Sequence, residues 1–292
     1  MKKLALAVSI LAISAVSASA ADLPVYTKAP PIEAVPSCIW CGFYVGGNVG
    51  YAGSESTSVN SSALVTNPGI VGGLGAPAIA AAGLTTGIPV GSQKGVIGGG
   101  QFGYNFQSGR FVAGLEADIQ GLSGRATGTS VTAVPVPGSA ANATLTATNS
   151  VNWLGTVRAR IGLAVVPNFL IYGTGGLAYG GVNSSTGVNQ DFLGELGEEL
   201  GSATTSGNLS ETRVGWTVGA GGEWMFTSNW SAKLEYLHYD LGSANYGTAV
   251  SNIAADIGTL FTLGQSSSTN FRGDIVRVGI NYRFGGPVGS NY

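Results

Sequence analysis

From residue 43 onward, the chain alternates apolar and polar positions with a period of two. In residues 111–119 the odd positions, from Phe111 to Ile119, are apolar, whereas Glu116 and Asp118 occupy even positions. Alternation of this length is typical of β-strands that have one apolar and one polar face. The pattern predicts strands over eight segments: 43–53, 94–106, 110–121, 151–165, 169–180, 212–226, 230–241 and 271–284.

Segment 169–180 carries apolar residues in both of its alternating rows, so the pattern does not decide which row faces inward. Each segment is also close to the 9–11 residues that a tilted strand needs to cross a bilayer.

The connections between these segments alternate in length. Short turns are expected near 107–109, 166–168 and 227–229, and long loops over 54–93, 122–150, 181–211 and 242–270. Outer-membrane barrels have short periplasmic turns and long external loops in this alternation. Four long loops, three short turns and two chain ends on the periplasmic side require eight strands. The sequence therefore predicts an all-β fold, an eight-stranded antiparallel up-and-down transmembrane β-barrel with four long external loops.

The composition favours a membrane barrel over a secreted soluble sandwich or barrel. Charged residues make up only 10% of the chain, against about 25% in ordinary soluble domains. The 48 glycines among 292 residues suit the crowded polar interior of a narrow barrel. Aromatic residues gather near the predicted strand ends, as interfacial girdles do: Trp40, Tyr51, Phe102, Phe111, Trp153, Phe169, Trp230 and Tyr282. The net charge of −2 argues against a nucleic-acid partner.

The N-terminus predicts export. Positive Lys2 and Lys3 precede an apolar run over 4–16, and Ala18-Ser-Ala20 supplies a cleavage site. The expected organisation is a cleaved secretory signal peptide at 1–20, a Pro-rich periplasmic linker at 21–39, the barrel at 40–284 and a short periplasmic tail at 285–292. The predicted location is the bacterial outer membrane, with extracellular loops and both termini periplasmic.

Facing the apolar rows toward lipid places nine charged side chains in the lumen. They are Glu116, Asp118, Arg158, Arg160, Glu223, Lys233, Glu235, Arg277 and Arg283. We expect Glu116 and Asp118 to pair with Arg158 and Arg160, and Glu223 to pair with Lys233. Buried charges persist when they are paired, so the set predicts a salt-bridged lumen. The functional alternative is a charge-lined path for small ions.

Cys38-Ile-Trp-Cys41 is a CxxC motif between the linker and the first strand. Without a βαβ context it is not expected to be a redox motif. A local disulfide, favoured in an oxidising periplasm, and two incidental thiols remain as alternatives. A zinc site would need two more ligands, and none stands nearby in the sequence, so no metal site is expected.

His238 is the only histidine, and we expect it to be an interfacial or rim side chain. Ser231 and Asp240 flank it only in sequence, so they do not make a hydrolytic site. No catalytic residue and no cofactor are predicted, and the chain is not expected to be an enzyme.

The last strand reads Arg277-Val-Gly279-Ile-Asn-Tyr282-Arg-Phe284 and resembles the C-terminal assembly signal of outer-membrane barrels. Segments 40–51, 170–180, 215–224 and 229–242 look like the alphaproteobacterial outer-membrane β-barrel surface-antigen family, whose members are OmpA-like in barrel size. The resemblance implies recognition of Arg277, Gly279, Tyr282 and Phe284 by the barrel-assembly machinery. It also implies an abundant envelope protein, in a family whose reported roles range from structural to porin to haemin binding. It carries over no family binding residues.

The sequence thus predicts a structural, surface-exposed envelope protein with a closed lumen. A small porin for passive solute diffusion is the first alternative, and a loop-based surface receptor for haemin or a host molecule is the second. The expected partners are outer-membrane lipid, lipopolysaccharide and the barrel-assembly machinery, while the sequence identifies no external ligand.

Overall fold

The computed structural model describes residues 38–55, 57–66, 88–136, 139–194, 196–254 and 260–284, all within one compact unit. The predicted signal peptide, the tail and all but the last two residues of the linker lie outside the described residues. Nearly every described residue belongs to a β-strand. Within these residues there is no helix with the length and apolar character that a membrane crossing requires.

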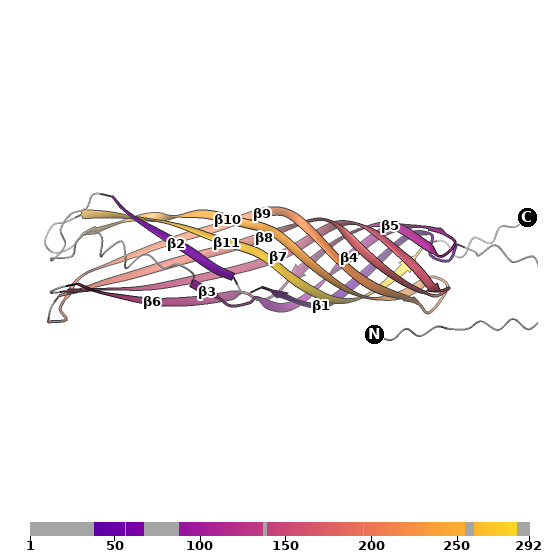
Figure 1. The fold of residues 1–292 in the computed structure, drawn as a ribbon, viewed down its shortest axis with the longest axis horizontal. Coiled ribbons are helices and arrows are strands. Elements are labelled where there is room, and N and C mark those ends of the chain that lie inside the picture. Colours follow the sequence, from indigo (N-terminus) through magenta and orange to yellow (C-terminus); the bar gives the residue numbers. More distant parts are fainter. Residues whose placement is uncertain are drawn as a thin grey trace, which may run out of the picture. The chain divides into compact units, whose positions relative to one another are not determined.

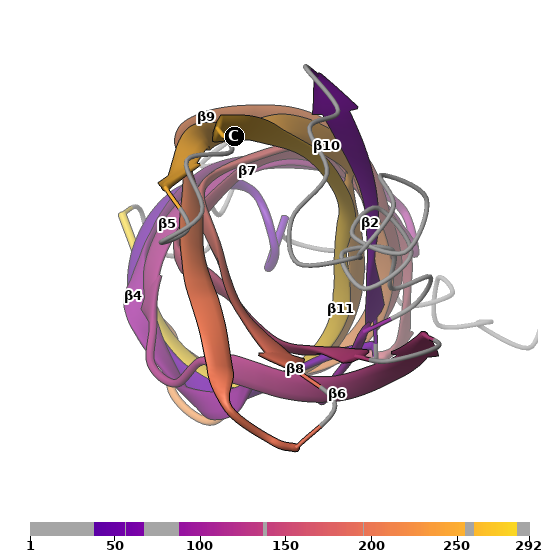
Figure 2. The same ribbon diagram turned by 90° about the vertical axis from the view of Figure 1, so that its left-hand side faces the viewer.

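Eight antiparallel strands form a closed ring, seen from the side in Figure 1 and along its axis in Figure 2. They are β1 (Gly42–Ser54), β4 (Lys94–Ser108), β5 (Phe111–Leu122), β7 (Ser139–Val166), β8 (Phe169–Gly194), β9 (Glu199–Met225), β10 (Trp230–Ala254) and β11 (Leu260–Arg283). Consecutive ring strands pair with each other, and β11 returns to β1, where Val278 lies opposite Val49. The predicted eight-stranded up-and-down barrel is confirmed.

Each ring strand presents an apolar row to the outside. One central residue of each row, 46–70% exposed, illustrates this: Val45, Phe102, Leu115, Ile161, Leu177, Val218, Leu234 and Val278. We call these outward rows the apolar band. In the segment left undecided by its sequence, Leu170, Tyr172 and Ala178 face inward, and Ile171 and Leu177 face outward. Polar side chains fill much of the interior, which reverses the arrangement of a soluble barrel.

The three short turns lie at one end of the ring, at the predicted positions, and join β4 to β5, β7 to β8 and β9 to β10. We call this the short-turn end. Gly109 occupies the first turn with φ of 60°, a left-handed conformation that glycine adopts without a Cβ penalty.

At the opposite end, which we call the long-strand end, the prediction of long loops is wrong over most of the length concerned. Residues 122–150 contain β6 (Ala126–Val136) paired with the first half of β7, and 181–211 and 242–270 continue the ring strands. The first connection holds β2 (Thr57–Thr66) and β3 (Ile88–Val90), with β2 paired to β11. Ser, Gly, Thr and Ala are the commonest residues of these segments, and an inward row that includes Leu145 and Val188 is buried. The ladders therefore persist well beyond the apolar band.

Two register shifts hide this continuity from the sequence. β7 shifts against β8 between Val151 and Trp153, and β10 shifts against β11 between Asp240 and Ser243. A bulge inserts one residue and reverses which parity faces inward. Inward positions in β10 accordingly change from odd, as at Leu241, to even, as at Ala244.

Candidate functional site

Eight charged side chains meet in the middle of the lumen, and we call them the lumen cluster. Its members are Glu116 and Asp118 on β5, Arg158 and Arg160 on β7, Glu223 on β9, Lys233 and Glu235 on β10, and Arg277 on β11. Each is at most 4% exposed. Four carboxylates and four bases give the cluster a formal charge of zero, as burial of so many ions requires.

Arg158 and Arg277 hold the centre of the cluster, and each contacts three carboxylates. The Nη2 atom of Arg158 lies 2.5 Å from Glu116 and 2.9 Å from Asp118, as the register between β5 and β7 predicts. The Nη2 atom of Arg277 lies 2.8 Å from Asp118 and 2.6 Å from Glu235. Because both guanidiniums share the same acids, the pairs form one continuous network.

Lys233 joins opposite walls of the barrel. Its Nζ atom donates to both oxygens of Glu116, at 2.8 and 2.9 Å. Lys233 is on β10 and Glu116 is on β5, which are four strands apart in either direction around a ring of eight. The contact therefore runs across the full width of the lumen.

The expected pair between Glu223 and Lys233 is not formed, although the two residues are directly opposite in the register of β9 and β10. Lys233 turns to Glu116 instead, and Glu223 binds Arg160 at 2.7 Å. Ser231 also donates a hydrogen bond to Glu223 at 2.5 Å. The shortest ion pairs of Lys233 and Glu223 therefore join strands that are not neighbours in the ring.

Arg283 is not part of the lumen cluster, contrary to the prediction. Its Nη2 atom donates to the backbone oxygen of Ser228 at 2.6 Å and lies 3.4 Å from the sulfur of Met225. It is at the margin of an internal cavity of about 10 Å³ near the short-turn end. Its role there is to hold the β9–β10 turn.

Two apolar layers inside the lumen escaped sequence reasoning. Toward the long-strand end, Leu154, Leu237, Ile275 and Phe271 are at most 3% exposed and pack with eight other apolar residues. A second cluster at the short-turn end includes Leu170, Tyr172, Met225, Val112, Ala164 and Trp40. The lumen cluster is thus stacked between two apolar layers.

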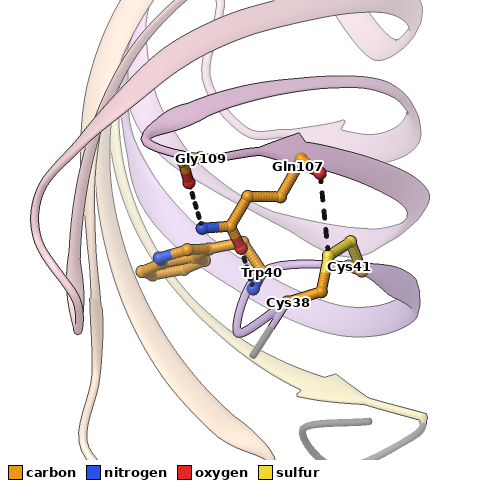
Figure 3. Close-up of a disulfide and its surroundings, with 5 residues drawn as sticks. All are labelled: Cys38, Trp40, Cys41, Gln107 and Gly109. Atoms are coloured by element: carbon orange, nitrogen blue, oxygen red, sulfur yellow. Dashed lines mark hydrogen bonds between the residues drawn. A yellow bond between two sulfur atoms is a disulfide. The ribbon is translucent and has the colours of Figure 1, made fainter. Parts of the chain in front are cut away.

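Trp40 is the centre of the second layer and not part of an interfacial girdle, so that expectation is wrong for this residue. It is 2% exposed, its backbone N–H donates to Gln107 Oε1 at 2.8 Å, and its indole N–H donates to the Pro167 oxygen at 3.1 Å. The structure has a disulfide between Cys38 and Cys41 on either side of it (Figure 3). This disulfide closes a short turn that directs the indole into the barrel.

The proposed assembly residues occupy both faces of β11. Tyr282 and Phe284 point outward with ring centroids 5.3 Å apart, whereas Arg277 is fully buried inside. Gly279 belongs to the same inward row as Arg277, and an added Cβ there would approach Gln101 and Lys233 closely.

A closed antiparallel ring, an outward apolar band and a charged, filled interior define the class of transmembrane β-barrels found in outer membranes. The comparisons with known proteins agree. The chain belongs to the outer membrane protein beta-barrel domain family, whose family model matches residues 8–284.

Two curated relatives give the likeness in detail. The chain is 36% identical over 287 residues to a 31 kDa outer-membrane immunogenic protein of Brucella melitensis, covering 97% of this chain and 100% of the relative. It is 35% identical over 150 residues to a 22 kDa outer membrane protein of Rhizobium leguminosarum, covering 51% and 54%. Among solved structures, OprG from Pseudomonas aeruginosa matches 84% of this chain and 97% of that chain at 11% identity, with a TM-score of 0.38. The family and the two curated relatives show that the protein is located in the outer membrane, where it contacts lipid.

Proposed function

We propose that this protein is a structural, surface-exposed component of the outer membrane whose lumen is closed to solutes. The observation that carries the proposal is the contact of Lys233 with Glu116 across the barrel. An open pore of this strand number has little room to begin with, because eight strands enclose a lumen that side chains can fill. A bridge between opposite walls removes the central path.

The stacking of layers strengthens the proposal. Before it reached the lumen cluster, an ion that entered from the long-strand end would have to pass Leu237 and Ile275, which are fully buried and offer no polar ligand. It would then have to displace a neutral network whose charges already bind one another. At the short-turn end it would meet Trp40. Each barrier differs in chemistry, so no single solute class is favoured by all three.

The proposed orientation puts the short-turn end and both termini in the periplasm and the long-strand end outside the cell, as is usual for this class. In this proposal residues 1–20 are removed on export, 21–39 form the linker and 285–292 form the tail. Arg277, Gly279, Tyr282 and Phe284 are offered to the barrel-assembly machinery, and lipopolysaccharide surrounds the outer half of the barrel. The protein has no catalytic role.

Single-channel recording on residues 21–292, refolded into a planar bilayer, tests the closed lumen. Protein shown to be folded by its heat-sensitive gel mobility is expected to give no conductance steps. A variant with Trp40→Ala, Lys233→Ala and Leu237→Ala removes one side chain from each layer and shows that the recording detects an opened barrel. Stable steps from the unaltered protein, changed in size by Glu116→Gln, would overturn the proposal and favour a small porin.

A further inference from the structure

The lone histidine lies in a cluster that the sequence does not reveal. His238 is on the outward face of β10, and its side chain is 24% exposed. Asp274 on β11 is directly opposite in the register, with 2.9 Å between His238 Nδ1 and Asp274 Oδ1. Glu55 follows the end of β1, the other neighbour of β11. Three adjacent strands thus bring one potential metal ligand each to the same spot.

The spacing of the three side chains suits a small cation. One ligand atom from each residue lies within 4.8 Å of the corresponding atoms of the other two. Metal ions of the zinc type bind imidazole nitrogen and carboxylate oxygen at about 2.0–2.2 Å, so ligand atoms must converge to roughly 3–4 Å. The carboxylate of Glu55 is 43% exposed and has room to move the short distance that closes the group.

Neighbouring side chains orient the two carboxylates while leaving an oxygen of each available. Arg272 Nε binds Glu55 Oε2 at 2.7 Å, and the Tyr236 hydroxyl donates to Asp274 Oδ1 at 2.6 Å. Among the described residues, neither Glu55 Oε1 nor Asp274 Oδ2 has a hydrogen-bond partner, so these two oxygens can bind a cation. Outer hydrogen bonds of this kind are the usual support of metal-binding side chains.

We propose that Glu55, His238 and Asp274 form a site for a divalent transition-metal ion of the zinc type on the outside of the barrel. The mixed nitrogen and oxygen donors favour such an ion over Mg²⁺ and Ca²⁺, which prefer oxygen ligands alone. Three protein ligands leave a fourth coordination position for water or for an anionic group beside the barrel. The site is at the edge of the apolar band, at the outward position of β10 that follows Leu234 and Tyr236, and does not depend on whether the lumen conducts.

The chain is well suited to a direct test because His238 is its only histidine and both cysteines are in the disulfide. The full-length mature protein, labelled with ¹⁵N-histidine in zwitterionic micelles, is titrated with Zn²⁺ and followed by the imidazole nitrogen resonances. Saturable shifts with one equivalent of Zn²⁺ are expected, and Mg²⁺ at the same concentration is expected to leave the resonances in place.

Matched variants separate a three-ligand site from binding to an isolated imidazole. Asp274→Asn and Glu55→Gln are each expected to weaken Zn²⁺ binding by about tenfold or more, whereas Asp240→Asn, an outward acid two residues from His238, leaves it unchanged. Gel mobility confirms that each variant is folded. Resonances that do not move in 1 mM Zn²⁺, or equal affinity in the unaltered protein and the Glu55→Gln/Asp274→Asn double variant, would overturn the proposal.

Discussion

Removal of the Arg277 guanidinium tests whether the lumen cluster stabilises the barrel as one neutral network. Arg277 is fully buried and binds Glu116, Asp118 and Glu235, and it also donates to the Gln120 side chain at 3.1 Å. Arg277→Met keeps a long side chain but leaves four carboxylates against three bases. The lumen then holds one uncompensated negative charge.

The expected loss of unfolding free energy is about 3–5 kcal/mol, the range found when one partner of a buried ion pair is removed. Asp118 decides where in this range the loss falls, because without Arg277 its only remaining ion-pair partner among the described residues is Arg158. Neutralising the orphaned acid as well, in Asp118→Asn/Arg277→Met, restores a formal charge of zero. The double variant is therefore expected to recover more than half of the loss.

Equilibrium urea unfolding in lipid vesicles, followed by tryptophan fluorescence and by gel mobility, measures these differences. Arg213→Gln is the matched control, because Arg213 pairs with Glu211 at 2.6 Å on the exposed part of β9. An exposed pair contributes about 0–1 kcal/mol, so this variant should be close to the unaltered protein. An Arg277→Met variant within about 1 kcal/mol of the unaltered protein, or a double variant no more stable than the single one, would refute the charge-balance argument.

Three further outcomes are expected. Gly46→Ala should destabilise the barrel by about 1–3 kcal/mol, because the added Cβ would overlap the backbone of β11. Gly47→Ala should be tolerated, because Gly47 is on the outward face and the nearest atom to an added Cβ is 3.7 Å away. Urea unfolding distinguishes the two variants, and equal losses of unfolding free energy would contradict the packing argument. Leu234→Arg in the apolar band should lower the unfolding free energy by about 2–4 kcal/mol. Leu196 is 95% exposed near the β8–β9 turn, so Leu196→Arg should leave the unfolding free energy almost unchanged. Similar losses at both positions would argue against the position of the band. Trp40→Ala should increase the rate at which water reaches the short-turn layer, measured as hydrogen exchange of the Met225 amide, and unchanged exchange would show that Trp40 does not seal that end.

Much of the barrel could be predicted because the physical rule behind it is local. Alternation with period two fixes which row of each strand faces lipid, and the turn lengths fix the strand count. The charged members of the lumen cluster follow from the same rule, since they occupy the positions that alternate with the apolar band and therefore face inward. Glu116 and Arg158 could even be paired, because they are neighbours in one ladder.

The features that escaped prediction depend on distances across the barrel or on breaks in the alternation. Lys233 prefers Glu116 on the far wall to Glu223 beside it, and no sequence separation encodes that choice. The inner apolar layers contain residues such as Leu237, which lies in the same inward row of its strand as the buried charges. In the sequence, an apolar residue in this otherwise polar row looks like a break in the alternation. The shift near Trp153 reverses the parity of β7 and makes its first half look like a loop.

The strands beyond the apolar band make the outer part of this barrel a stiff stalk. Residues 181–194 of β8 are hydrogen-bonded to β7 and to β9 along nearly their whole length. At about 3.3 Å per residue and a tilt of roughly 35–45°, they lift the turn around Leu196 by roughly 35 Å. In the proposed orientation, a peptide grafted into that turn would be held at a fixed height above the bilayer. Adding or removing paired residues in the stalk would change that height two residues at a time without altering the membrane-embedded ring, so the barrel offers an adjustable scaffold for peptide display.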